Sequence, residues 1–157
     1  MIQWLATITP FQELLASNTT LRRGMEICES FAGFYIPALQ GLMQRPEVLQ
    51  GEPGELLLEL LLTGDGHLRV AAMGGYMRER YLHEGRWIPA LTALGARAQL
   101  VWATDDPIAN VALGRELSRR CPEARYVELP GLGHFLLMED PARVAAEVRA
   151  FVGGLAR

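Results

Sequence analysis

The C-terminal part of the chain alternates short apolar runs with amphipathic segments. Residues 97–103 and 125–129 are short apolar runs bounded by turn residues, a pattern typical of buried parallel strands. Residues 108–120 lie between them and have helical spacing, with Leu113 and Leu117 one turn apart before Cys121-Pro122 ends the segment. This order predicts two parallel strands joined by a helical crossover.

A final helix is predicted after the second strand. Asp140 stands at its N-cap, Pro141 lies in its first turn, and Gly153-Gly154 is expected to end it. Val144, Val148, Phe151 and Val152 fall on one stripe of this helix. The fold class is therefore α/β, but two strands alone do not make a stable sheet, so one edge of the pair should seek further strands.

The first ninety or so residues show helical spacing instead. One segment, 55–62, has leucine at six of its eight positions, and we expect it to be buried on several sides or to lie in an interface before Gly64-Asp65-Gly66 ends it. We divide the chain into a helical part, 1–95, and a part with the two strands, 96–157. The other helices are predicted at 11–17, 20–43 with a kink at Pro37, 68–82, and 86–94 with Pro89 early in it.

Composition narrows the classes of function. Half of the residues are apolar, the net charge is −3, and no basic block occurs, so a nucleic-acid surface is not expected. All fifteen basic residues are arginine, which excludes a lysine Schiff base and a P-loop. Cys28 and Cys121 lack the spacing of a zinc site and fit a reduced, cytoplasmic protein without metal or cofactor. The apolar stretch 56–62 is too short to cross a bilayer, and the N-terminus shows no signal peptide.

Asp106 and His134 are the candidate catalytic residues. Each follows one of the two predicted strands, and the carboxyl ends of adjacent parallel strands meet at one edge of a sheet. A carboxylate there can hold an imidazole by one ring nitrogen and leave the other free to take a proton. The alternatives are a loop histidine bonded to backbone and a turn aspartate before Pro107, and Asp105 competes with Asp106 for the acidic role.

No residue of the chain qualifies as the nucleophile of such a triad. Three serines fall in helical patterns without paired glycines, and Asp65, although it lies between two glycines, follows a helix rather than a strand. The serines are Ser17, Ser30 and Ser118.

These residues resemble the C-terminal third of an α/β-hydrolase. The similar elements are the run 100–108 with Asp105-Asp106-Pro107, the segment 130–135 with Gly133-His134-Phe135, and Glu139-Asp140-Pro141. In the family the acid stands three residues after a glycine, and this chain has Ala103 in place of that glycine. Within residues 56–141 the chain is also similar to hydrolases like the mesoderm-specific transcript protein, close to the epoxide hydrolase and haloalkane dehalogenase branch. The segments that carry this likeness are 64–66, 76–80 and 86–91.

The resemblance implies a division of the catalytic machinery. Residues 1–95 would form a helical lid and 96–157 the end of the core, while the nucleophile elbow and oxyanion hole would lie outside this chain. The implied reaction is hydrolysis of a small apolar ester, epoxide or halide, with an N-terminal half chain or a homo-oligomer as partner. The rival hypothesis is a non-catalytic interaction module, or an inactive truncated hydrolase, that folds by oligomerisation. Less specific candidates are His67 and His83, the lid tyrosines Tyr35, Tyr76 and Tyr81, and the cavity residues Trp4, Phe11, Phe31 and Phe34.

Overall fold

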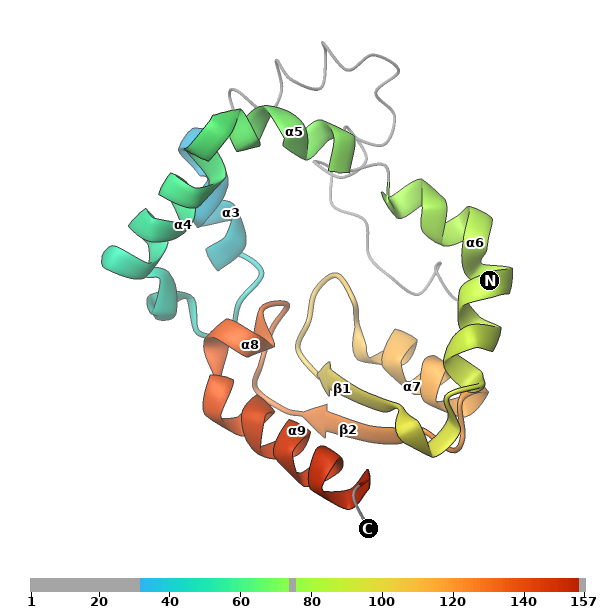
Figure 1. Ribbon diagram of the computed structural model, residues 1–157. Coiled ribbons are helices and arrows are strands. Elements are labelled where there is room, and N and C mark those ends of the chain that lie inside the picture. Colours follow the sequence, from blue (N-terminus) through green and yellow to red (C-terminus); the bar gives the residue numbers. More distant parts are fainter. Residues whose placement is uncertain (1–31, 74–75, 156–157) are drawn as a thin grey trace. The chain divides into compact units, whose positions relative to one another are not determined.

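The computed structural model describes residues 32–73 and 76–155 (Figure 1). The predicted helix at 11–17 and the first part of the one at 20–43 lie outside the described residues. The elements are η2 (Ala32–Phe34), α3 (Tyr35–Gln40), η3 (Pro46–Leu49), α4 (Glu52–Leu62), η4 (Thr63–Asp65), α5 (Gly66–Met73), α6 (Tyr76–Thr92), η5 (Gly95–Arg97), β1 (Gln99–Ala103), α7 (Val111–Arg120), β2 (Arg125–Leu129), α8 (Leu136–Glu139) and α9 (Pro141–Leu155), where η marks a 3-10 helix.

The chain forms two compact units. Among the described residues, one unit contains 42–45 and 83–155, and therefore both strands; the other contains 32–41 and 46–82 apart from 74–75. The short segment Leu42–Arg45 thus belongs with the sheet although helices of the other unit flank it in sequence. The predicted boundary between 95 and 96 stays a prediction.

The two strands pair in parallel, as predicted from the apolar runs. Gln99 lies opposite Arg125 and Ala103 opposite Leu129, so both strands end at the same edge of the sheet. The connection between them contains α7, which begins after Asn110, whose side chain accepts a hydrogen bond from the Ala112 N–H at 3.1 Å. Both β1 and β2 are visible side by side in Figure 1.

Each face of the strand pair is covered by one helix. On one face Ala103, Leu129 and Leu132 form a buried cluster with Val144 of α9. On the other face, the Trp102 and Tyr126 side chains lie against Gly114 of α7. Because successive side chains of a strand point to opposite faces, this arrangement makes helix–sheet–helix layers from neighbouring residues of β1.

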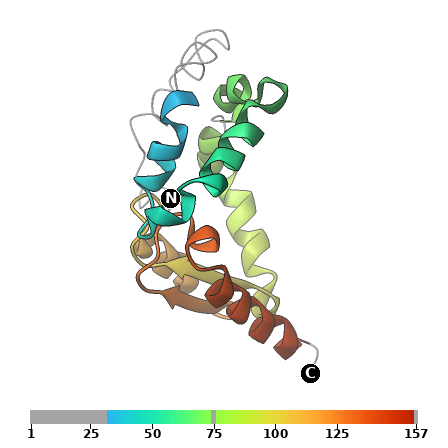
Figure 2. The same ribbon diagram turned by 90° about the vertical axis from the view of Figure 1, so that its left-hand side faces the viewer.

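Only the first turns of α9 are well covered. Val144 is 5% exposed, whereas Val148, Val152 and Leu155 are 46%, 56% and 50% exposed. Figure 2 shows α9 leaving the strands towards the C-terminal end of the chain. The expectation that Gly153-Gly154 ends this helix was wrong, because both glycines are helical and the helix continues to Leu155.

Two further helix boundaries differ from the predicted ones. The segments 68–82 and 86–94 were expected to be separate helices, but α6 runs from Tyr76 to Thr92 with Pro89 inside it, so the hydrogen bond that this proline removes does not end the helix. Residues 74–75, which stand between α5 and α6 in the sequence, lie outside the described residues. The leucine-rich helix α4 ends as expected, where Gly64 and Asp65 adopt φ of 57° and 58°. Its Leu56 and Leu60 are exposed.

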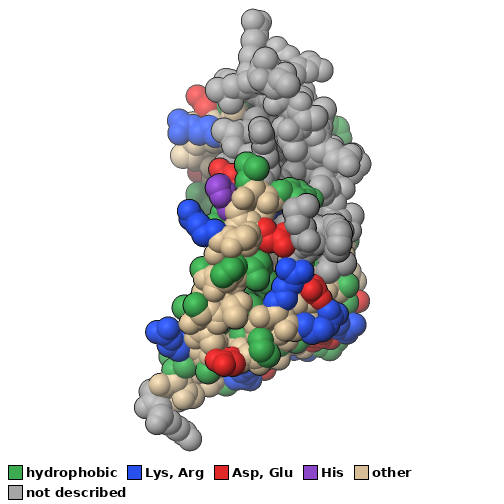
Figure 3. All heavy atoms as spheres, turned by 90° about the vertical axis from the view of Figure 1, so that its right-hand side faces the viewer, with side chains coloured by type: hydrophobic (Ala, Val, Ile, Leu, Met, Phe, Trp, Pro, Cys, Tyr) green, Lys and Arg blue, Asp and Glu red, His purple; other side chains and the backbone are tan. Residues whose placement is uncertain are grey.

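Charged side chains of both signs are mixed on the surface. Figure 3 shows blue and red side chains interspersed with green ones on one face. None of the helices in the described ranges is long and apolar enough to cross a membrane. Several arginines form ion pairs with acidic side chains. The pairs of the sheet-containing unit include Arg115–Glu128, Arg120–Glu84, Arg120–Glu116 and Arg125–Glu147.

Gly114 provides a test of the packing between α7 and the sheet. A Cβ at this position would stand 2.5 Å from Trp102 Cδ2 and 2.8 Å from the Tyr126 hydroxyl oxygen. We expect Gly114→Ala to lower the free energy of unfolding by about 1–3 kcal/mol, because the rings cannot retreat without disturbing the strands. Urea unfolding followed by circular dichroism measures this change.

The matched control is Gly153→Ala in α9. Nothing lies within 4 Å of a Cβ at Gly153, and alanine in a helix is favoured over glycine by about 0.5–1 kcal/mol. An equal stability change in both variants would contradict the packing described for α7.

Candidate functional site

Asp106 lies in the turn that follows β1. The Thr104 N–H donates to the Leu129 carbonyl at 3.2 Å, and the Asp105 N–H donates to the Leu132 carbonyl at 3.1 Å, so this turn is joined to the segment after β2. Asp106 Oδ1 accepts hydrogen bonds from the N–H groups of Ile108 and Ala109 at 2.8 and 2.9 Å.

The far end of the same turn is held by Trp102. Its indole N–H donates to the Ala109 carbonyl at 2.7 Å. A strand residue thus fixes the acid-bearing loop, hereafter residues 104–110, from the side that faces α7.

His134 follows β2 through a turn at Gly131. Gly131 has φ of 76°, a conformation that favours glycine, and the chain then passes through the fully buried Leu132. The His134 N–H donates to the Leu42 carbonyl at 2.9 Å, which ties this loop to the segment Leu42–Arg45. The Phe135 ring meets the imidazole edge-on, with ring centroids 5.0 Å apart.

The structure brings Asp106 and His134 together. His134 Nδ1 lies 3.1 Å from Asp106 Oδ1 and 2.9 Å from Oδ2. Because an ionised carboxylate only accepts hydrogen bonds, Nδ1 carries the proton and Nε2 of the neutral ring is left with its lone pair. The His134 side chain is 31% exposed and that of Asp106 only 8%. The pair can therefore present an oriented base to a neighbouring group, and its catalytic role stays a prediction.

The environment of Asp106 keeps it ionised. Burial opposes the charge and raises the pKa of Asp106. The hydrogen bond and charge of His134, together with the N–H groups of Ile108 and Ala109, lower the pKa by more than burial raises it. The net effect is a pKa below the ordinary value of 3.8. The carboxylate is thus charged at neutral pH, the state in which it orients the imidazole.

Asp105 points elsewhere and has different partners. Its Oδ2 accepts from the Thr104 hydroxyl at 2.7 Å and from the Gly131 N–H at 2.8 Å. These two hydrogen bonds lower the pKa of Asp105, which is an exposed carboxylate. Geometry thus gives the two neighbouring aspartates separate partners: Asp105 holds the Gly131 turn, and Asp106 holds His134.

The less specific histidine and tyrosine candidates are in the helices α3, which contains Tyr35, α5 and α6. His67 is in α5, His83 and Tyr81 are in α6, and the Tyr76 ring lies under Arg80, whose guanidinium carbon is 4.6 Å from the ring centroid. Among the described residues no three histidine, cysteine or acidic side chains are grouped so as to hold a metal ion. Phe34 is 69% exposed, and the other predicted cavity residues, Trp4, Phe11 and Phe31, lie outside the described ranges.

The candidate nucleophiles in the described residues do not lie at a strand-to-helix turn. Ser118 lies in α7 and Asp65 in η4, whereas Ser17 and Ser30 are outside the described residues. The nucleophile elbow of such hydrolases lies between a strand and a helix. Neither Ser118 nor Asp65 stands in that position.

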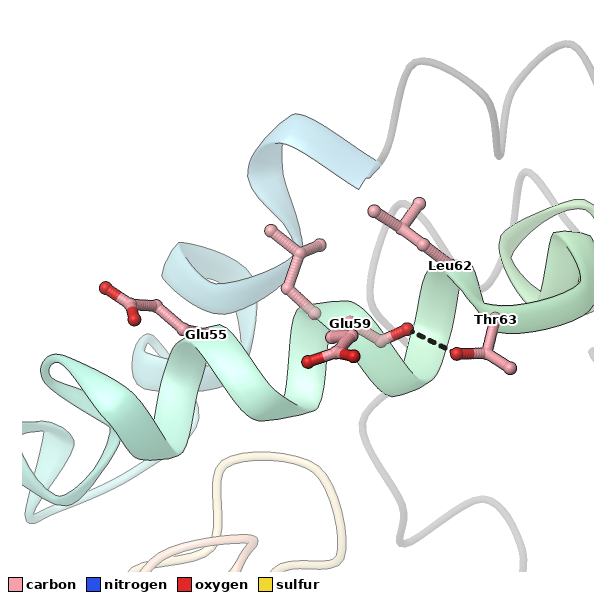
Figure 4. Close-up of a pocket in the computed structure, with 5 residues that line it drawn as sticks. Glu55, Glu59, Leu62 and Thr63 are labelled. Atoms are coloured by element: carbon pink, nitrogen blue, oxygen red, sulfur yellow. Dashed lines mark hydrogen bonds between the residues drawn. The ribbon is translucent and has the colours of Figure 1, made fainter.

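A hollow runs along the surface of α4 in the other unit. Figure 4 shows Glu55 and Glu59 on successive turns and the Thr63 hydroxyl donating to the Glu59 carbonyl, a distance of 2.9 Å. Leu58 and Leu62 complete the lining. The lining contains no histidine or cysteine, and we assign no role to this hollow.

One buried residue near His134 was not predicted as a candidate. Glu139 is 3% exposed, and its carboxylate accepts hydrogen bonds from backbone N–H groups of Gln44, Arg45 and Gly133. The sequence marks Glu139 only as part of the family-like run Glu139-Asp140-Pro141 and does not indicate that its side chain is buried. Its partners are up to 95 residues away in the chain.

Comparison with known proteins finds two curated relatives. The chain is 34% identical over 97 residues to "Putative hydrolase LipZ" of Mycobacterium tuberculosis, strain CDC 1551 / Oshkosh, and equally to the LipZ of strain ATCC 25618 / H37Rv. The match covers 62% of this chain and 34% of each relative, so the chain corresponds to about a third of their length. No solved structure matches the chain significantly.

A family model describes most of the molecule. The model of the alpha/beta hydrolase family matches residues 4–147, which include both strands, Asp106 and His134. The chain therefore belongs to the alpha/beta hydrolase family.

Proposed function

We propose that this chain supplies the acid and the general base of a hydrolytic triad, Asp106 and His134. The observation that carries the proposal is the hydrogen bond of His134 Nδ1 to both oxygens of the Asp106 carboxylate. That contact fixes the tautomer in which Nε2 can accept a proton from a hydroxyl nucleophile or from water. Asp106 then stabilises the imidazolium that forms.

The nucleophile of this reaction comes from outside the chain. Neither a serine nor an aspartate of the sequence stands between paired glycines after a strand, and the chain corresponds to 34% of the length of its relatives. The sheet supports the same proposal. Among the described residues β1 pairs only with β2, so its other edge has unpaired backbone groups to which further strands can bind. An N-terminal half chain would add those strands together with the oxyanion hole.

The substrate we propose is a small apolar ester, epoxide or halide. The segments similar to the epoxide hydrolase and haloalkane dehalogenase branch support this class. In an ester reaction, His134 would activate a serine hydroxyl. In an epoxide or halide reaction, an aspartate would form an ester with the substrate, and His134 would activate the water that cleaves it.

Exposed apolar helices support a second candidate function. Leu56 and Leu60 of α4 are 53% and 61% exposed, and Val148 and Val152 of α9 are similarly open. Such faces are common in surfaces that bind other chains. An interaction module that folds by self-association, with the Asp106–His134 pair retained but unused, would need these faces and no nucleophile.

Replacement of the base separates the two functions. The chain is mixed or co-expressed with a candidate N-terminal half chain that contains Gly-x-Ser-x-Gly or Gly-x-Asp-x-Gly, and hydrolysis of a chromogenic ester and of an epoxide is followed. We expect activity only in the mixture, and a loss of at least about 10³-fold on His134→Ala. The matched control is His83→Ala, an exposed ring packed on Trp87, which should keep full activity. An inactive mixture, or equal activity with His134→Ala, would support the interaction module.

The two neighbouring aspartates give a second comparison. Asp106→Asn keeps an oxygen for the N–H groups of Ile108 and Ala109 but removes the charge that holds the imidazole. We expect kcat of the same mixture to fall by about 10³–10⁴-fold in this variant and to change less than about tenfold in Asp105→Asn, whose partners are Thr104 and Gly131. Similar losses of kcat in both variants would contradict the role of Asp106 as the acid of the triad.

Acid unfolding tests the charge on Asp106 without any substrate. Its folded pKa is below 3.8, so the folded state favours the ionised form. The resulting stabilisation is fully present above the unfolded pKa and is lost as the pH falls through the folded one. Asp106→Asn should therefore be less stable than the native chain at pH 7 by about 1–3 kcal/mol, with a gap that shrinks below pH ~4. Urea unfolding at several pH values measures the gap, and a constant gap down to pH 3 would be the contrary result.

A further inference from the structure

Glu139 is the most buried carboxylate of the sheet-containing unit among the described residues. It ends α8, and its side chain accepts hydrogen bonds from three backbone N–H groups. The Gly133 N–H lies 3.1 Å from both of its oxygens, and Oε2 also accepts from Gln44 N–H at 2.9 Å and Arg45 N–H at 3.2 Å. One carboxylate therefore binds two segments that are distant in the sequence.

These hydrogen bonds surround the backbone of His134. Gly133 precedes the histidine directly, and the His134 N–H itself donates to the Leu42 carbonyl at 2.9 Å. The two segments also touch at Gly133, where a Cβ would stand 2.5 Å from the Leu42 carbonyl oxygen and 3.0 Å from Met43 Cα and Glu139 Oε1. The histidine loop is thus closed on Leu42–Arg45 with no room for a side chain between them.

The side-chain oxygens of Glu139 accept hydrogen bonds from backbone N–H groups. Arg45 is adjacent, but its guanidinium donates to the Glu139 carbonyl at 3.2 Å and to Asp140 Oδ2 at 3.3 Å. A buried carboxylate with several N–H donors is stable as an anion, and loss of one acceptor leaves buried N–H groups unsatisfied. A glutamine would offer one acceptor oxygen and would aim its amide N–H₂ at backbone donors.

We propose that Glu139 is a positioning residue for His134. By holding the N–H groups of Gly133, Gln44 and Arg45, it fixes the backbone from which the imidazole reaches Asp106. The geometric part of this inference concerns only the folded chain. Its catalytic consequence rests on the proposed function, in which His134 is the base.

The experiment reads the imidazole directly, by NMR of the full chain labelled with ¹⁵N-histidine at about pH 8.5, where histidine is normally neutral. In the native chain we expect His134 Nδ1 to be protonated, as its bond to Asp106 requires, and His134→Ala assigns the signal. In Glu139→Gln the ring should shift towards the Nε2–H tautomer that a neutral histidine side chain prefers in water. The matched control is Glu147→Gln. This substitution removes a carboxylate of α9 that is paired with Arg125 of β2, and it should leave the ring signals unchanged.

A merely structural role for Glu139 predicts another result. Glu139→Gln would then unfold at a lower urea concentration, but the ring signals of the folded fraction would match the native ones, and the proposal would be overturned. Gly133→Ala is a second variant that keeps the carboxylate and forces the same segments apart, and it should cause the same tautomer shift.

The native chain decides the matter if both variants fail to fold. In an acid titration, the amide shifts of Gly133, Gln44 and Arg45 should share one midpoint with the Glu139 carboxyl carbon, and separate midpoints would overturn the proposal. Failure of the proposed function is a distinct outcome: the tautomer result would hold, while the mixture with the candidate N-terminal half chain would hydrolyse no substrate.

Discussion

The parallel pairing of β1 with β2 is the constraint on which the candidate site depends. Because the two strands run in the same direction and in register, the turns that follow them leave from one edge. Asp106 is three residues beyond the end of β1, and His134 is five beyond the end of β2. Their contact therefore follows from strand direction, and an antiparallel pair would send the two turns to opposite edges.

Several local features reinforce that contact. The N–H groups of Ile108 and Ala109 hold the carboxylate, Asp105 holds the Gly131 turn, and Glu139 holds the loop before the histidine. These hydrogen bonds arise from carboxylates that meet backbone N–H groups in tight turns. The contact between Asp106 and His134 is consequently supported by hydrogen bonds in both of the turns that carry these residues.

The sequence was informative where local chemistry decides the structure. The apolar runs before Asp106 and His134 predicted both strands, and Asp140 with Pro141 predicted the start of α9. Helix ends were less predictable, since Pro89 and Gly153 both lie inside helices although proline and glycine disfavour helix interiors. The contact of Glu139 with Gln44 and Arg45 could not be predicted, because 94 or more residues separate the partners and no periodicity connects them.

Trp102, one of three tryptophans in the chain, places an optical label against the acid-bearing loop. Its indole N–H is bound to the Ala109 carbonyl, and its ring lies on Gly114 of α7. An indole senses the polarity and hydrogen bonding around it, so a rearrangement of residues 104–110 would be transmitted to the emission of this ring. Arrival of a partner at the neighbouring β1 edge could accordingly be followed in real time by light, without attaching a dye.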